Sequence, residues 1–337
     1  MTRIAVLDDY IGCAQEFGDW AALGDDAEIT FYREAIDPER LTDELADYEI
    51  LAITQQRTWF PRQVLERLPK LELIVCNGPT SNVIDHEYRR ERGIMLCGTA
   101  DLPAGRRIPA DARPPRPDPR TRRGIATPAE MAWALLFAVT KRIGIEDRVI
   151  RSGGWQTGFP VPLSGLTLGL AGLGNLGSMM VAPARVFGMD VIAWSQNLTD
   201  ERAKELDVPR VSKEELLRRS DVLGIFLVLS DRTRGLFQRE DLALMKPTAF
   251  IVNISRGPII DEAALVDALR GGRLAGAGLD VFDREPLPAD HPLRSMENVV
   301  LMPHVGYVTE AGFRRSFSLM AEDIAAFMKG QPIRVVE

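Results

Sequence analysis

Short apolar runs alternate with helix-like stretches along the first hundred residues of the chain. Each run is rich in aliphatic or β-branched residues, and polar or turn-forming residues bound it. Apolar residues at helical spacing lie between the runs. This alternation predicts a parallel α/β fold. The predicted strands are Ile4–Leu7, Ile29–Tyr32, Ile50–Ile53 and Leu73–Cys76, with the series ending near Cys97–Thr99, and the predicted helices include Asp37–Asp47 and Pro61–Leu68.

A second series of the same kind follows a predicted helix that begins at Thr127. Thr127 as N-cap, Pro128 at the first helical position and Glu130 at the third form a capping box. The residues that follow are apolar on nearly every face, so we expect this helix to be buried against a second domain or a second subunit. Further strands are predicted at Thr167–Ala171, Asp190–Trp194, Val222–Leu229, Ala249–Ile254, Gly276–Val281 and Val299–Met302, and a closing helix at Thr309–Met328.

Residues 100–123 interrupt this pattern. They contain seven Arg and six Pro but only two large aliphatic residues, so they cannot build a core of their own. We predict an irregular, solvated surface insertion. A basic lid that attracts an anionic substrate is the alternative.

Composition and charge exclude several classes of function. A chain of 337 residues suggests about two domains, and a net charge of −7 argues against a nucleic-acid or membrane-surface role. The three cysteines have no metal-ligand spacing, so we expect reduced, mostly buried thiols and no metal site. The longest apolar stretch, Met131–Val139, is too short to cross a membrane, and no signal peptide is visible. A cytoplasmic protein is predicted.

The sequence GLGNLG at residues 172–177 matches the GxGxxG fingerprint of dinucleotide-binding sites. It follows an apolar strand and precedes a predicted helix and a second strand, which is the context that the motif requires. The glycines allow a tight turn and close backbone approach, and free N–H groups at the helix start suit a pyrophosphate. The predicted cofactor-binding residues of this loop are Gly172, Gly174, Asn175, Leu176 and Gly177.

The end of the second strand normally decides between NAD and NADP. An acid there binds the ribose hydroxyls of NAD, whereas an Arg suits the 2′-phosphate of NADP. This chain has Ser195, Gln196 and Asn197 in that place, with neither an acid nor a base. Ser195 and Asn197 could hydrogen-bond a ribose hydroxyl or tolerate a phosphate, so NAD is the predicted cofactor and NADP stays open.

Three later strands end in residues that can carry out acid–base chemistry on a carboxylic acid. Arg256, Glu285 and His304 each follow one of these strands, and the carboxyl edge of an open α/β sheet is where ligands bind. His304 can donate or accept a proton near neutral pH. Glu285 can stabilise the protonated imidazole and fix its tautomer, and the forked guanidinium of Arg256 suits a substrate carboxylate. We therefore predict these three as catalytic residues.

Taken together, these segments resemble the D-isomer-specific 2-hydroxyacid dehydrogenases. The resemblance lies in GLGNLG, VNISRGPIIDEAAL, GAGLDVFDREPLPADHPL and NVVLMPHVGYVTE, and it covers nearly the whole chain except residues 100–123. It implies two Rossmann-like, doubly wound parallel-sheet domains, with the cofactor domain inserted into a discontinuous substrate domain. The implied boundaries are 1–99 plus 309–337 for the substrate domain, 100–123 for the insertion and 124–308 for the NAD(P)-binding domain.

The resemblance also implies roles for further residues and partners. Asn175 and Leu176 would contact the pyrophosphate, Ile254, Ser255 and Arg256 would line the nicotinamide together with His304, and Asp280 would hold its carboxamide. The loop that begins at Asn77 and Gly78 and continues through Pro79 and Thr80 would bind the substrate carboxylate. The expected substrate is a small D-2-hydroxy or 2-keto acid such as glyoxylate or hydroxypyruvate, and a homodimer is expected.

Two other readings remain at this point. Formate dehydrogenases share the scaffold but typically carry Gln at the position of Glu285, so a 2-keto acid fits this chain better. The co-repressors that sense NAD(H) resemble the same family and keep the three catalytic residue types, so motifs alone do not separate a sensor from an enzyme. The insertion at 100–123 is the feature that could serve such a sensor as a partner-binding arm.

Overall fold

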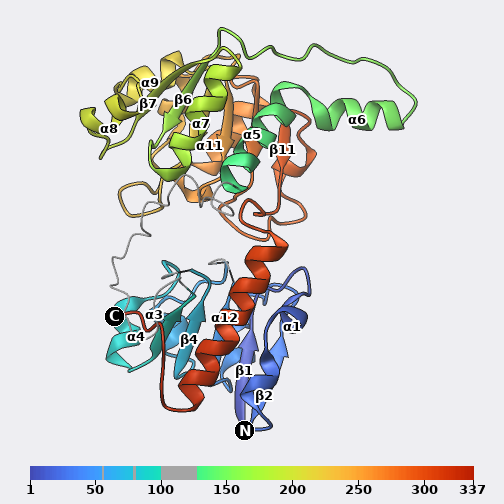
Figure 1. Ribbon diagram of the computed structural model, residues 1–337. Helices are drawn as coiled ribbons and strands as arrows, with labels where there is room; N and C mark the ends of the chain where they lie inside the picture. The colour runs from blue at the N-terminus through green and yellow to red at the C-terminus, as the bar shows by residue number, and fades with distance from the viewer. Residues whose placement is uncertain (55–56, 79–80, 100–126) are drawn as a thin grey trace. The chain divides into compact units, whose positions relative to one another are not determined.

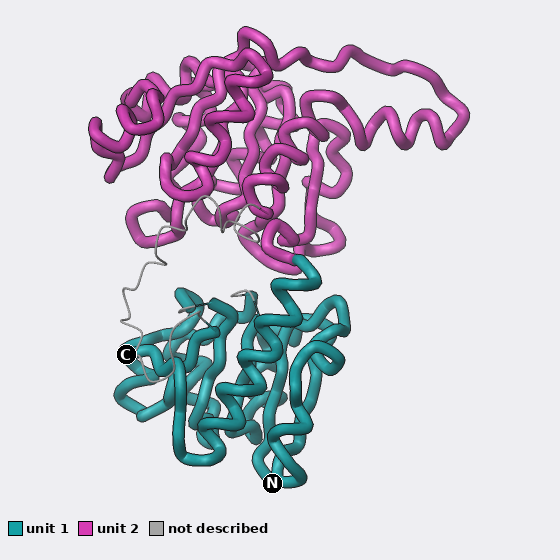
Figure 2. The backbone as a smooth tube through the Cα atoms, in the orientation of Figure 1, with its two compact units in different colours: residues 1–117, 309–337 teal, residues 118–308 magenta. Residues whose placement is uncertain are grey.

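The computed structural model describes residues 1–54, 57–78, 81–99 and 127–337. The chain forms two compact units: unit 1 comprises Met1–Pro117 with Thr309–Glu337, and unit 2 comprises Asp118–Val308 (Figure 2). The predicted insertion at 100–123 lies outside the described residues, as do Pro79 and Thr80 of the predicted substrate loop.

Unit 1 is built on a five-stranded parallel sheet with the order β2-β1-β3-β4-β5. The chain reverses its direction of winding beside β1. Because the strands are parallel, the ends of β1, β3 and β4 lie at one edge of the sheet. The two central strands are buried at every position, as expected for a sheet covered on both faces. The strands are β1 (Thr2–Val6), β2 (Ala27–Phe31), β3 (Ile50–Ile53), β4 (Leu73–Cys76) and β5 (Met95–Gly98).

Helices cover this sheet, and the C-terminal helix returns to it from the far end of the sequence (Figure 1). Helix α12 packs on β4 and on the N-terminal helices, and Phe313, Phe317 and Met320 are among its buried residues. The last residues then pair with β5, where Val335 bridges Cys97. The helices of unit 1 are α1 (Ala14–Phe17), η1 (Trp20–Leu23), α2 (Leu41–Leu45), α3 (Arg62–Leu65), α4 (His86–Glu91) and α12 (Glu310–Met328).

Unit 2 contains a six-stranded parallel sheet with the order β11-β10-β9-β8-β6-β7. Arg210 forms a parallel bridge to Ala193 of β7, so the chain adds one more pairing at that edge. The winding direction changes between β6 and β8, which is the switch point where open α/β sheets bind ligands. The strands are β6 (Thr167–Ala171), β7 (Asp190–Trp194), β8 (Val222–Ile225), β9 (Phe250–Asn253), β10 (Gly276–Leu279) and β11 (Val299–Leu301).

Two separate hydrophobic layers hold helices on the two faces of this sheet. Helices α5 and α7 share one core with β6 and β7, and α9, α10 and α11 share the other with β8 and β9. This doubly wound arrangement confirms the predicted fold class. The helices are α5 (Thr127–Thr140), α6 (Ile143–Arg151), α7 (Asn175–Val186), α8 (Asp200–Glu205), α9 (Lys213–Arg219), α10 (Arg239–Ala243) and α11 (Glu262–Arg270), with short turns η2 (Gly257–Ile259) and η3 (Pro292–Ser295).

Several predicted elements are shorter than expected. The strand predicted at Val222–Leu229 ends at Ile225. The helix predicted at Asp37–Asp47 begins at Leu41, because the carboxylate of Asp37 accepts the Glu39 amide and forms a turn before the helix. The helix predicted at Pro61–Leu68 covers only Arg62–Leu65, with Pro61 as N-cap.

Two further outcomes concern helix α5 and the helix that follows it. α5 is buried along most of its length, as predicted, and it packs against β9, β10 and β11 of its own unit. Its first helical residue is Thr127, and the residues before it lie outside the described part of the chain. Helix α6 was not predicted, and none of its side chains is buried.

Candidate active site

The glycine loop of unit 2 joins β6 to α7 and has the geometry of a dinucleotide cradle. Gly172 has φ +104°, and a Cβ there would lie 2.6 Å from the carbonyl oxygen of Phe226. A Cβ on Gly177 would lie 2.0 Å from the carbonyl oxygen of Gly172, so this position also excludes any side chain. Gly174, the N-cap of α7, has open space where its Cβ would stand. The loop therefore leaves room for a pyrophosphate at the helix start.

The predicted site residues of unit 2 all lie at the carboxyl edge of its sheet. Their side chains or amides come from the segments that follow five different strands, and β9, β10 and β11 are adjacent in the sheet. Gly172, Gly174, Asn175, Leu176 and Gly177 follow β6; Ser195 follows β7; Ile254, Ser255 and Arg256 follow β9; Asp280 and Glu285 follow β10; and His304 follows β11.

His304 and Glu285 form a short, buried hydrogen bond. The Nδ1 atom of His304 lies 2.5 Å from Oε2 of Glu285, and the side chain of His304 is only 9% exposed. The other carboxylate oxygen of Glu285 accepts the backbone N–H of Phe282 at 2.9 Å. Burial alone would raise the pKa of Glu285, but the hydrogen bond and charge of His304, with help from Phe282 and Arg256, lower it. Glu285 is therefore a carboxylate anion, and it holds the imidazole ring of His304 at its Nδ1 atom.

Arg256 is held at the end of β9 by the backbone and by two polar neighbours. Its Nη1 atom donates to the carbonyl oxygen of Ser255, and Asn253 donates from Nδ2 to the carbonyl oxygen of Arg256 at 3.0 Å. Ser255 donates to the carbonyl oxygen of Ile225 at 2.8 Å, which ties this turn to the end of β8. The positive charge of Arg256 helps to lower the pKa of Glu285. The guanidinium and the His304–Glu285 pair therefore share one electrostatic environment.

Asp280 lies beneath the loop that carries His304. Its Oδ1 and Oδ2 atoms accept the backbone N–H groups of Val305 and Gly306, each at 2.8 Å, and the residue is 1% exposed. Burial raises the pKa of Asp280, while the two amide hydrogen bonds and His304 oppose that rise. Asp280 thus contacts the loop that carries His304 directly, a role that its sequence position did not reveal.

In unit 1, the predicted substrate loop begins with two amides that already have partners. The N–H of Asn77 donates to the carbonyl oxygen of Ile53, and the N–H of Gly78 donates to Oγ1 of Thr99 at 3.0 Å. A carboxylate that binds through the Gly78 amide must therefore replace the Thr99 hydroxyl. The binding of a substrate carboxylate by Asn77 and Gly78 therefore stays a prediction.

The other two histidines of the chain, His86 and His291, have structural partners. His86 lies in α4 with Nε2 2.7 Å from the carbonyl oxygen of Ser81. His291 caps η3 and places Nε2 3.1 Å from Oε1 of Glu262. Cys13, Cys76 and Cys97 are free and buried, as predicted.

Sequence reasoning missed three residues at this edge of unit 2. Val228 is 75% exposed and comes directly after Phe226 and Leu227, which lie against Gly172 of the glycine loop. Tyr307 is half exposed and lies close enough to Arg256 to feel its charge. Arg202 donates to the carbonyl oxygen of Leu173, inside the glycine loop. Of these three residues, only Tyr307 could have been found from the sequence, because it lies three residues after the predicted site residue His304.

Comparison with known proteins places the chain in a family. The model of the family described as "D-isomer specific 2-hydroxyacid dehydrogenase, NAD binding domain" matches residues 133–306. A glyoxylate reductase from Thermococcus litoralis is 32% identical over 90% of this chain and 88% of that protein. A glyoxylate reductase from Aeropyrum pernix is 43% identical over 60% of this chain, and the match spans 63% of its length, less than two thirds.

A solved structure agrees with these sequence matches. The phosphoglycerate oxidoreductase from Vibrio cholerae superposes with a TM-score of 0.83 at 29% identity, covering 98% of this chain and 100% of that one. The chain belongs to the D-isomer-specific 2-hydroxyacid dehydrogenase family, and it is an oxidoreductase with an NAD(P)-binding domain. No helix within the described ranges combines the length and the apolar character that a membrane crossing needs.

Proposed function

We propose that this protein interconverts small 2-keto acids and D-2-hydroxy acids, with His304 as the acid–base residue. The observation that carries the proposal is the 2.5 Å contact between Nδ1 of His304 and Glu285, beside Arg256 at the carboxyl edge of the sheet. An imidazole held on one side by a carboxylate presents its other nitrogen to a ligand. That nitrogen, Nε2, can exchange a proton with the oxygen on the substrate's second carbon.

Each residue contributes one part of the reaction. Arg256 binds the substrate carboxylate and polarises the neighbouring carbonyl, because its fork matches two oxygens and it carries a permanent charge. In the reducing direction His304 gives its Nε2 proton to the carbonyl oxygen, which becomes the hydroxyl of the product. Glu285 stabilises the protonated imidazole before that transfer and keeps the Nδ1 proton in place. In the oxidising direction, His304 removes the same proton.

The glycine loop and the turn after β9 are the parts that would hold the cofactor. The open space over Gly174 and the free amides at the start of α7 fit a pyrophosphate. Ile254, Ser255 and Asp280 would border the nicotinamide. When bound, the reduced nicotinamide supplies the hydride that the second carbon of the keto acid receives.

The family resemblance supports a small substrate and a dimer. The relatives named above as glyoxylate reductases suggest glyoxylate or a similar short acid. We also propose a homodimer, in which the apolar surface of α6 and the following loop lies against a second copy. Trp155 and Phe159 are 74% and 95% exposed, and α6 extends away from the sheet of unit 2 (Figure 1). A cytoplasmic location stays a prediction.

The test is oxidation of NADH and NADPH by glyoxylate, hydroxypyruvate, pyruvate and 2-ketoisocaproate, followed by the loss of reduced-nicotinamide absorbance. We expect turnover with at least one acid, and a loss of about a hundredfold or more in kcat/KM for His304→Ala. His86→Ala is the matched control and should keep full activity. A folded protein that binds NADH yet turns over none of these acids would favour the sensor reading.

A further inference from the structure

The adenosine end of the cofactor site lies where β7 ends, and there no carboxylate is in place. Trp194 is followed by Ser195, Gln196 and Asn197, and the carbonyl oxygen of Ser195 accepts the N–H of Leu198 in a tight turn. An acid at this position would accept the two ribose hydroxyls of NAD. Without it, the turn offers no anion that would repel a phosphate on the ribose.

A guanidinium stands beside this turn instead. Arg202 lies in α8, whose N-cap Thr199 accepts the backbone N–H of Arg202. Its Nε atom donates to the carbonyl oxygen of Leu173 at 3.3 Å, between Gly172 and Gly174. The chain therefore folds the side chain of Arg202 back onto the loop that receives the cofactor, although seven positions separate it from Ser195.

Arg202 keeps part of its fork for a ligand. Nη1 pairs with Oε2 of Glu205 at 2.9 Å, and the side chain is 22% exposed. Within the described residues, no partner is bonded to Nη2. Asp200, the first acid along the chain after the turn, pairs with Arg210 at 2.9 Å, and Arg210 itself lies beside β7 through its bridge to Ala193. Arg202 thus lies at the glycine loop and Arg210 beside β7, and each of these two guanidinium groups is paired with one carboxylate.

We infer that the cofactor site prefers NADP(H), with Arg202 binding the 2′-phosphate through its guanidinium. This inference rests on the proposed function, because it concerns the same cofactor site. A phosphate with two negative charges and a forked donor form charge-assisted hydrogen bonds that a ribose hydroxyl cannot match. Glu205 then acts as the anion that holds Arg202 in place rather than as a ribose ligand.

The test measures binding without any keto acid, so that it does not depend on turnover. Dissociation constants for NADPH and NADH are obtained by titration with the wild-type chain and with Arg202→Gln, and 2′,5′-ADP and 5′-AMP serve as fragments that lack the nicotinamide. We expect NADPH to bind at least about tenfold more tightly than NADH. Arg202→Gln should weaken NADPH and 2′,5′-ADP by about tenfold or more, and NADH and 5′-AMP by less than about twofold.

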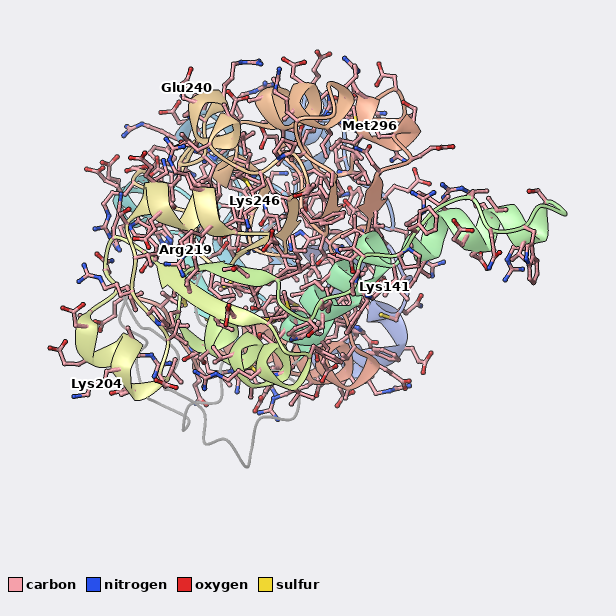
Figure 3. The ribbon with its side chains drawn as sticks, turned by 90° about the horizontal axis from the view of Figure 1, so that it is seen from above. Lys141, Lys204, Arg219, Glu240, Lys246 and Met296 are labelled. Carbon is pink, nitrogen blue, oxygen red and sulfur yellow. The ribbon has the colours of Figure 1, made fainter. Side chains whose placement is uncertain are left out.

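Lys204 provides the matched control, because it is an exposed cation on the same helix (Figure 3). Lys204→Gln should leave the ratio of the two dissociation constants unchanged. Tighter binding of NADH than of NADPH by the wild type overturns the inference, and so does an equal loss for both cofactors in Arg202→Gln. Glu201, the acid before Arg202 in α8, is the alternative ligand for the ribose hydroxyls. Weaker NADH binding in Glu201→Gln would show that Glu201 has this role and would also overturn the inference. Failure to bind either cofactor would instead count against the proposed function.

Discussion

The carboxylate of Asp280 accepts the backbone N–H of Gly306 at 2.8 Å, two residues beyond His304, the proposed acid–base residue. His304 itself has φ +55°, a left-handed conformation that a non-glycine residue adopts only when its surroundings enforce it. A Cβ on Gly306 would lie 2.9 Å from Oδ2 of Asp280, so glycine permits the close approach. Asp280 therefore stabilises the turn that presents the imidazole.

The first prediction concerns Asp280→Asn. The Asn side chain can accept only one of the two amides, and its NH₂ group would face the other N–H. One buried N–H then loses its acceptor, which should lower the free energy of unfolding by about 1–3 kcal/mol. We also expect kcat to fall because His304 is less well placed. Urea denaturation and steady-state kinetics measure both effects, and Asp267→Asn, at an exposed carboxylate paired with Arg239, serves as the control.

The second prediction concerns the reduction rate of Glu285→Gln. The lowered pKa of Glu285 keeps it ionised through the neutral range, where it favours the protonated imidazole of His304. Removal of this charge should lower the rate of reduction by about tenfold or more, because the imidazole loses the anion that stabilises its protonated form. The measurement is kcat/KM for keto-acid reduction at neutral pH.

The control for this experiment is the second His–Glu pair of unit 2. Glu262→Gln removes the carboxylate that contacts Nε2 of His291 at 3.1 Å, without touching His304. Its kcat/KM should equal that of the wild type. If both variants lose activity equally, the effect is a general one of charge and Glu285 has no special role.

The strands that were predicted to the residue share one physical property. In β3, β4, β6 and β7 an apolar run lies between polar or turn-forming residues, so both the core and the ends are visible in the sequence. The run Val222–Leu229 looks the same, but its second half leaves the sheet beside the glycine loop, and Val228 is exposed there. Hydrophobicity alone does not distinguish a side chain that faces the core from one that faces a ligand or a partner.

The residues of the candidate site also fall into those that the sequence predicts and those that it does not. Arg256, Glu285 and His304 could be proposed from sequence because each directly follows a buried strand, and parallel strands end at one edge. Arg202 could not, since its approach to Leu173 depends on the path of the chain through a turn and a short helix. The hydrogen bonds of Asp280 also depend on the backbone of a loop that no side-chain pattern records.

The third prediction concerns the oligomeric state. Replacement of Trp155 and Phe159 by Ser removes most of the exposed aromatic surface after α6, so the proposed dimer should dissociate. Light scattering during gel filtration should give the mass of two chains for the wild type and of one for the double variant. Trp59→Ser, at a half-exposed Trp in unit 1, should stay dimeric. A wild-type mass of one chain would contradict the dimer.

The last prediction uses a buried carboxyl group of α12. Asp323 is fully buried; its Oδ1 atom accepts a hydrogen bond from Nε of Arg334 at 2.8 Å, and its Oδ2 has no partner in the part of the chain that the structure describes. Burial raises the pKa of Asp323 from 3.8 to about 7, although Arg334 opposes that rise. The folded chain therefore keeps this proton over a pH range in which the unfolded chain has already released it.

Linkage gives the sign of the effect on stability. Because the native state binds the extra proton, the contribution of Asp323 is fully present below pH 3.8 and is lost as the pH rises towards about 7. Asp323→Asn cannot titrate, so its free energy of unfolding relative to wild type should increase over this range, by at most a few kcal/mol. Amide hydrogen exchange in β4 and β5 reports on unit 1 alone. Asp43→Asn, at an exposed carboxylate, should show no such trend, and a flat difference for Asp323→Asn would mean that Arg334 keeps Asp323 ionised.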